Sequence, residues 1–223
     1  FLNRSGILGN ASVHSFTDLG LSGQLLLYMG TFLLGAIGMS IYRWKDLPKD
    51  TKELGTYNRE FWVFVGAAVL GLSAFQLTFT TSIPVYNKIA EAFGVLSNIA
   101  LPADQAEHYS KIQIWIFLAV TILSGIGQYV WWGKIKQSIT FKPLISPALA
   151  ATLLSVVFIN IGKIYTFSYI ALLWGSLFSV LANFKILWFL LREKFSLVGG
   201  AVAHVGLAIM LIGILFSAGY SKV

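Results

Sequence analysis

Three histidines are the residues of this sequence best suited to chemistry: His14, His108 and His204. An imidazole can ligate a metal or haem iron, or move a proton near neutral pH. The three lie about ninety residues apart, so they form no local metal-binding motif, and any joint role must come from folding. The chain has no Cys, which excludes disulfides, thiolate ligands and Cys nucleophiles. Phosphate-loop, dinucleotide, zinc-protease and serine-hydrolase motifs are also absent.

His204 lies inside an apolar stretch, about six residues past its start, which corresponds to a depth of about 9 Å in a membrane helix. Ionisable groups at such depth are costly and usually face the protein interior with a partner. Gly200 and Ala208, one turn before and one turn after, share its helical face and leave room for a flat group. Two interpretations follow from the residues: an axial ligand to haem iron, or a neutral histidine hydrogen-bonded to a neighbouring helix.

The other two histidines have polar surroundings. His14 lies in the N-terminal segment 1–21, where Asp18 follows four residues later. If this segment is helical, the carboxylate can orient the imidazole for ligation. The alternative is a solvated histidine in a loop. His108 has polar neighbours, and the sequence assigns it no task.

The elements that must position these residues are apolar. Of 223 residues, 57% are hydrophobic and 11% charged, whereas a soluble domain carries about 25% charged residues. Six stretches approach the roughly 20 residues of a membrane-spanning helix, and they are apolar on every face, unlike membrane strands. We therefore predict an all-α polytopic transmembrane bundle, a single membrane domain over 1–223. The predicted spans are 22–42, 61–80, 112–132, 144–160, 167–191 and 198–218. The last also carries a small-residue stripe that predicts packing against another helix: Gly199, Ala203, Gly206 and Gly213.

The Lys and Arg residues predict the orientation. Segments 43–60, 133–143 and 192–197 hold ten of them, and the segments on the other side hold five. Cytoplasmic loops carry the excess of positive charge, so both chain ends and His14 are expected outside. The basic residues that give the net charge of +7 follow the predicted cytoplasmic ends of the spans. They form no patch interleaved with aromatic residues, which argues against nucleic-acid binding.

The longest outer connection, 81–111, has a helical pattern of its own. After Pro84, apolar residues recur at helical spacing: Val85, Ile89, Ala92, Phe93 and Leu96. We expect either an interfacial helix in contact with the outer leaflet lipid or a short helix packed on neighbouring spans.

Two segments resemble the CcmF/CcsA family of cytochrome c biogenesis proteins, which carry a tryptophan-rich WWD domain. Phe1–Gly20, FLNRSGILGNASVHSFTDLG, contains Ser12-Val13-His14 and Phe16 as in the family's S-V-H-x-F segment. Gly199–Tyr220, GGAVAHVGLAIMLIGILFSAGY, is similar to the family's G-G-x-x-A-H-x-G span. Between these segments the likeness is one of hydropathy.

The resemblance implies haem ligands. His14 would hold haem transiently on the outer side, with Arg4 as a propionate partner, for attachment to the C-x-x-C-H motif of an apocytochrome c. His204 would be one of two transmembrane histidines that hold a permanent haem b. The protein would be a haem lyase of the bacterial inner membrane. In the CcmF branch, which fits slightly better, its partners would be a CcmE-like haem chaperone and CcmH-like or thioredoxin-fold proteins.

The chain also departs from the family pattern. It lacks the motif W-G-G-x-W-x-W-D and both partner histidines, and it starts at Phe1. We therefore expect a C-terminal section with half the axial ligands of each haem site, inactive alone and binding haem weakly or not at all. The rival interpretations are a six-span transporter or channel, for which Gln76 and Asn183 are candidate midplane residues, and a structural subunit without a cofactor.

Overall fold

The structure is a computed structural model that describes residues 22–46, 59–135 and 142–218. Within these ranges all regular structure is helical, which confirms the predicted all-α class. Five described helical segments are long and apolar enough to cross a membrane: Phe61–Thr81, Glu107–Tyr129, Lys142–Gly162, Phe167–Glu193 and Phe195–Ser217. The chain is therefore a polytopic helical membrane protein.

Each of the six predicted spans corresponds to a long helix. These are α1 (Ser22–Tyr42), α2 (Arg59–Thr81), α4 (Gln105–Ile135), α5 (Lys142–Gly162), α6 (Phe167–Glu193) and α7 (Val198–Ala218). Two 3₁₀ turns, η1 (Trp44–Asp46) and η2 (Phe195–Leu197), accompany α1 and α7. Among the described residues of α1, the apolar helical segment is Gly30–Tyr42.

Helix α4 begins seven residues before the predicted span, at Gln105 instead of 112. The Asp104 carboxylate accepts a hydrogen bond from the Glu107 backbone N–H at 2.8 Å, as an N-terminal cap does. One turn further on, Lys111 and Glu107 form an ion pair at 2.8 Å. This polar first turn has no apolar periodicity, so hydropathy alone does not detect it.

The helix predicted within 81–111 is confirmed as α3 (Ile83–Ala92). Pro84 lies in its first turn, where a missing N–H costs nothing. Its C-terminal end is closed by Gly94, with φ of +73°, and by a 2.9 Å bond from the Val95 N–H to the Ala90 carbonyl. Asn87 then fixes the segment that follows, since its side chain donates to the Ile99 carbonyl at 2.9 Å. The location of α3 on the outer leaflet stays a prediction.

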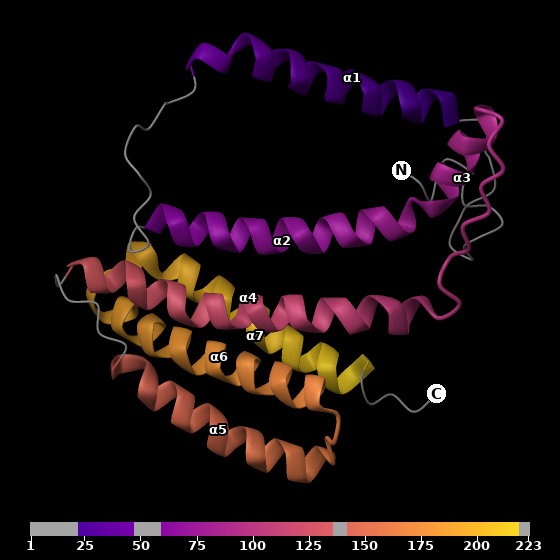
Figure 1. Cartoon of the computed structure of the whole chain (residues 1–223). Coiled ribbons are helices and arrows are strands. Elements are labelled where there is room, and N and C mark those ends of the chain that lie inside the picture. The colour runs from indigo at the N-terminus through magenta and orange to yellow at the C-terminus, as the bar shows by residue number, and fades with distance from the viewer. Residues whose placement is uncertain (1–21, 47–58, 136–141, 219–223) are drawn as a thin grey trace. The chain divides into compact units, whose positions relative to one another are not determined.

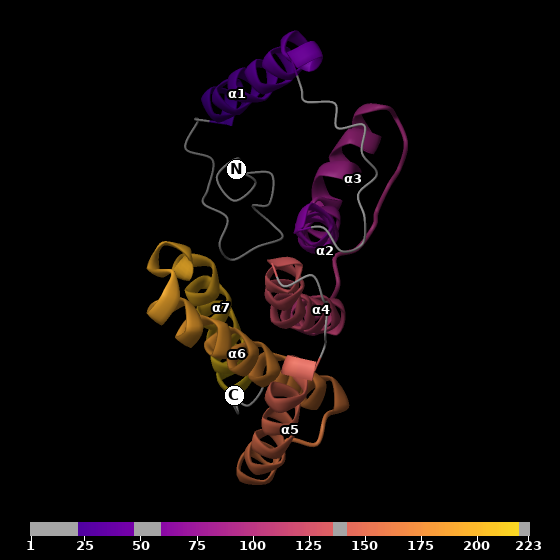
Figure 2. The ribbon, with the colours of Figure 1, turned by 90° about the vertical axis from the view of Figure 1, so that its left-hand side faces the viewer.

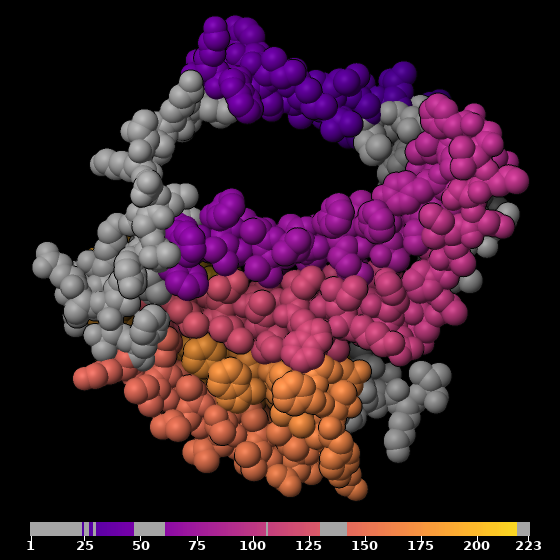
Figure 3. Space-filling model, viewed as in Figure 1, coloured from indigo at the N-terminus to yellow at the C-terminus, as the bar shows by residue number. Residues whose placement is uncertain are grey.

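The chain forms two compact units. One contains the described parts of Phe1–Glu53 and Leu77–Ala103, and the other those of Leu54–Gln76 and Asp104–Val223. In the second unit α6 lies beside α4, α5 and α7; it runs parallel to α4 and antiparallel to α5 and α7 (Figures 1 and 2). The side chains of α4, α5 and α6 meet along one packed surface (Figure 3).

Helix α6 forms the core of this second unit. Its buried residues include Leu172, Leu173, Leu177, Phe178, Ala182 and Asn183. Glycine permits the closest approach between α4 and α6. A Cβ atom at Gly175 would lie 2.6 Å from Thr121 Oγ1 and 2.8 Å from Leu118 Cδ1, and one at Gly125 would lie 2.5 Å from the Phe178 ring. Small residues at helix interfaces let backbones approach, which is how membrane helices gain packing energy.

The prediction that the small-residue stripe of α7 packs against another helix is wrong for the described part of the chain. Gly199, Ala203, Gly206 and Gly213 are exposed, and Cβ atoms at the three glycines would meet nothing within 4 Å. The buried residues of α7 are instead Ala201, Ala208, Leu211 and Leu215. They recur at near-heptad spacing, so they stay on one face, and the two leucines bury more apolar area than glycines would.

Replacement of Gly175 by Val should destabilise the protein by about 1–3 kcal/mol, because the added atoms cannot fit beside Thr121 and Leu118. Thermal unfolding of the detergent-purified protein measures this. Gly213→Val is the matched control, since its Cβ meets open space on α7. Equal stability losses in the two variants would show that close α4–α6 packing is not the cause.

Candidate functional site

A cavity of about 720 Å³ lies within the second unit, bounded by α2, α4, η2 and α7. Its volume falls within the range of about 300–1,000 Å³ typical of ligand and cofactor sites. The walls are mostly apolar and contain many small residues. They are formed by Trp62, Val63, Gly66, Ala67, Leu70, Val120, Leu123, Ser124, Gly127, Gln128, Ser196, Leu197, Gly199, Gly200, His204 and Leu207.

His204 contributes the single ionisable side chain among these lining residues. It is half-buried and lies on the second turn of α7. Gly200, one turn earlier, lines the same cavity, as the sequence predicted for that face. Ala208 does not line it and is instead buried, 1% exposed, in the packed face of α7. The reason is geometric: four residues turn a helix by about 400°, so each step of four moves about 40° around the axis.

Glycines keep the cavity open. Cβ atoms at Gly66, Gly127 and Gly199 would meet nothing within 4 Å, so these residues border free space. A Cβ at Gly200 would lie 3.5 Å from Gln128 Nε2. The Gln128 amide therefore lies opposite the helix turn that precedes His204.

Gln128 is a site residue that reasoning from the sequence missed. A lone glutamine in an apolar stretch forms no motif, and nothing along the chain links it to a residue in the last span. The one signal was the pair Gly127-Gln128 inside a span, where a small residue beside an amide indicates space and polarity together.

Ser124 connects the cavity wall to α6. Its hydroxyl accepts hydrogen bonds from Ser179 Oγ at 3.1 Å and from Asn183 Nδ2 at 3.3 Å. Asn183 is fully buried, and its amide also donates to the Ser179 carbonyl at 2.9 Å. Asn183, a candidate midplane residue of the transporter interpretation, therefore joins α4 to α6. It does not line the cavity.

A second polar cluster joins the α2 wall to α4. Ser73 Oγ donates to Gln113 Oε1 at 2.7 Å, and Gln113 Nε2 donates to Gln76 Oε1 at 2.7 Å. Interhelical hydrogen bonds of this kind hold membrane helices together. Gln76, the other midplane candidate, thus belongs to the contact that keeps α2 against α4.

The predicted outer-site residues are not described, and the third histidine lies away from the cavity. His14, Arg4 and Asp18 are outside the described residues. His108 lies in the first turn of α4, with its ring 5.5 Å from that of Tyr109, at the opposite end of α4 from the cavity residue Gln128. In the part of the chain that is described, no three His, Cys, Asp or Glu side chains form a group that could hold a metal ion.

Fold and cavity together define a polytopic helical membrane protein with a histidine in the wall of a cavity between long apolar helices. The chain is similar to the cytochrome c-type biogenesis protein CcmF of Escherichia coli (strain K12), with 24% identity over 226 residues. The match covers 99% of this chain and 34% of CcmF, so the chain spans about a third of that relative's length. No protein-family model and no solved structure matches the chain.

Replacing Gln113 by Leu should loosen α2 from α4, because the Ser73 and Gln76 side chains lose the amide that joins them. We expect a stability loss of about 1 kcal/mol and faster hydrogen exchange along α2. Gln105→Leu, at the exposed start of α4, is the matched control. Unchanged exchange in α2 would contradict this role for Gln113.

Proposed function

We propose that this chain is a haem-handling part of a CcmF-like protein of cytochrome c biogenesis, with His204 as an axial ligand of a b-type haem. The observation that carries the proposal is the placement of His204 in the wall of an apolar cavity of about 720 Å³. The similarity to CcmF over 99% of the chain, which includes the G-G-x-x-A-H-x-G pattern around His204, also supports it.

The residues of the cavity suit haem. A neutral imidazole is a common ligand of haem iron, and apolar walls with small residues accept a flat macrocycle. Among the described lining residues His204 is the single imidazole, so a second axial histidine would come from outside this set. Gln128, Ser124 and Ser196 offer hydrogen-bonding groups for polar substituents. Bound haem would supply one-electron chemistry, while the chain holds the group and excludes water.

The proposal includes an outer site formed by His14, Arg4 and Asp18. His14 would ligate haem reversibly, Asp18 would orient its imidazole, and Arg4 would pair with a propionate. Haem held there would be attached to the C-x-x-C-H motif of an apocytochrome c, so the protein would act by positioning. The inner membrane, an outward-facing His14, and CcmE-like and CcmH-like or thioredoxin-fold partners belong to the same proposal. The segment Phe1–Gly20 supports it.

The rival functions have less support. A transporter needs polar groups along a path, whereas Asn183 is fully buried between α4 and α6, and Gln76 hydrogen-bonds to Gln113 of the neighbouring helix. A structural subunit without a cofactor would need neither the cavity nor an ionisable group in its wall, since cavities cost packing energy.

His204→Ala should abolish the optical spectrum of b-type haem, because the iron loses its protein ligand in the cavity. The detergent-purified protein is titrated with haem under reducing conditions, without added imidazole. His108→Ala is the matched control and should bind as the unaltered protein does, because His108 is remote from the cavity.

His204→Gly should regain the spectrum when imidazole is added, since free imidazole can occupy the space of the lost side chain. Retention of an unaltered spectrum in His204→Ala would sink the assignment. Loss in both His204→Ala and His108→Ala would equally contradict a specific site.

Gly127→Leu should lower haem affinity tenfold or more, because the new side chain extends into the cavity where a Cβ meets open space. Gly213→Leu adds the same atoms on an exposed part of α7 and should leave affinity unchanged. Thermal unfolding checks that both variants are folded. Equal affinities in the two variants would exclude this cavity as the haem site.

A further inference from the structure

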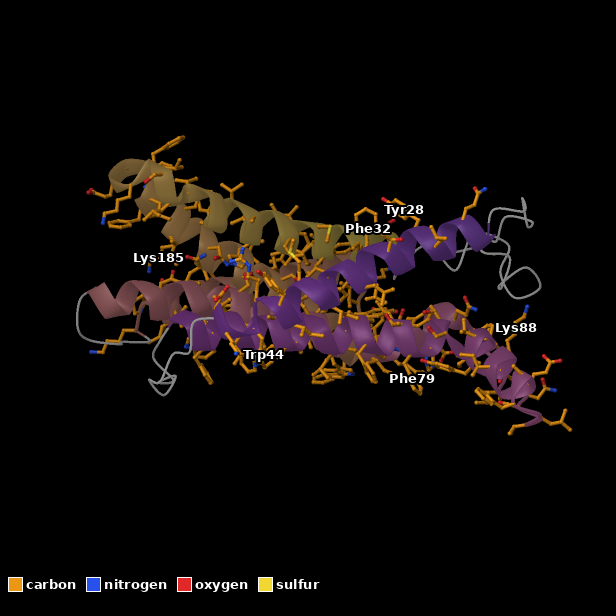
Figure 4. The ribbon with its side chains drawn as sticks, turned by 90° about the horizontal axis from the view of Figure 1, so that it is seen from above. Tyr28, Phe32, Trp44, Phe79, Lys88 and Lys185 are labelled. Atoms are coloured by element: carbon orange, nitrogen blue, oxygen red, sulfur yellow. The ribbon has the colours of Figure 1, made fainter. Side chains whose placement is uncertain are left out.

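A second hollow lies on the outer surface of α6, away from the His204 cavity. It is an open groove of about 430 Å³ lined by Leu181, Phe184, Lys185 and Trp188. Phe184 and Lys185 follow Leu181 by three and four residues, and Trp188 follows them by four and three, so the four share one helical face. Three are large and apolar, and the fourth, Lys185, is a cation (Figure 4).

Lys185 lies where α5 begins. Its Nζ atom donates to the Pro143 carbonyl at 3.2 Å and to Ser146 Oγ at 3.1 Å. An ammonium group has three N–H donors, so one remains for a further acceptor. Helices α5 and α6 run antiparallel, and further along this pair Trp174 Nε1 of α6 donates to Thr152 Oγ1 of α5 at 3.1 Å. The last two turns of α6 therefore extend past the first residue of α5.

Arg192 provides a second cation on this exposed end of α6. Its guanidinium carbon lies 4.8 Å from the centre of the Trp188 ring, so the side chain reaches back towards the groove. Lys185 precedes the same tryptophan by three residues, and the two cations thus flank one indole. The ion pairs found among the described residues, Arg43–Asp46 and Lys111–Glu107, involve neither cation.

The other charged groups near this end do not neutralise the pair. Lys142, the first residue of α5, is exposed and adds positive charge. Glu193 follows Arg192 in sequence, and about 100° of helix rotation separates the two positions. Tryptophan and basic residues at one end of a membrane helix are typical of the membrane–water interface.

We propose that this groove binds an anionic phospholipid. The phosphate would accept hydrogen bonds from the free N–H of Lys185 and from the Arg192 guanidinium, while an acyl chain lies along Leu181, Phe184 and Trp188. Charge complementarity and the continuity of cations with an apolar groove favour a lipid over a soluble anion. The site is independent of the proposed haem function.

Native mass spectrometry of the detergent-purified protein tests the site. We expect phosphatidylglycerol to be retained and phosphatidylcholine with the same acyl chains to be lost. Lys185→Gln/Arg192→Gln should bind phosphatidylglycerol about fivefold more weakly for each cation removed. Lys88→Gln/Lys163→Gln removes two exposed cations elsewhere and should bind as the unaltered protein does.

Arg192→Gln alone keeps the test valid if the double variant misfolds, because the cation–π contact of this side chain is with Trp188 of its own helix. Equal retention of the two lipids, or equal losses in test and control variants, would overturn the proposal. So would displacement of the lipid by inorganic phosphate at millimolar concentration, or a lipid-free dimer that Arg192→Gln dissociates.

Discussion

Close contact between α6 and α4 is the constraint on which the second unit depends. Lipid offers apolar side chains as good an environment as protein does, so membrane helices associate through tight packing and interhelical hydrogen bonds. Gly175 admits Thr121 and Leu118 into contact with the α6 backbone, and Gly125 admits the ring of Phe178. Asn183, Ser179 and Ser124 add hydrogen bonds along the same interface. With α6 fixed to α4, α5 and α7 pack on its remaining faces.

Glycine has two opposite uses in this unit. At the α4–α6 interface a neighbouring side chain occupies the space beside the glycine, whereas Gly66, Gly127 and Gly199 border free space. The same residue type therefore brings one pair of helices together and leaves a cavity beside His204. The groove on α6 does not depend on glycine. It forms because α6 extends beyond the start of α5 and leaves Trp188 and Arg192 exposed.

Most of the fold was predictable because hydropathy is a local property. All six apolar stretches are helices, and the short helix after Pro84 was expected from its apolar spacing. The start of α4 was missed because an Asp104 cap and a Glu107–Lys111 ion pair, both polar, form its first turn. The packing face of α7 was assigned wrongly, since small residues permit close packing but do not require it. The face of α7 that packs carries Leu211 and Leu215 instead, and these side chains bury more apolar area than glycines would.

The sequence by itself determined the helical membrane class, the approximate spans and the place of His204 within the last span, because chain length and polarity set the cost of each residue in lipid. Only the tertiary structure decided which side of α7 faces α6, and hence that Gly200 lines the cavity while Ala208 is buried. It also brought Gln128 and Trp62 to the cavity of His204 from helices far away in the chain. Such contacts depend on how several helices rotate against one another, and no local pattern encodes that rotation.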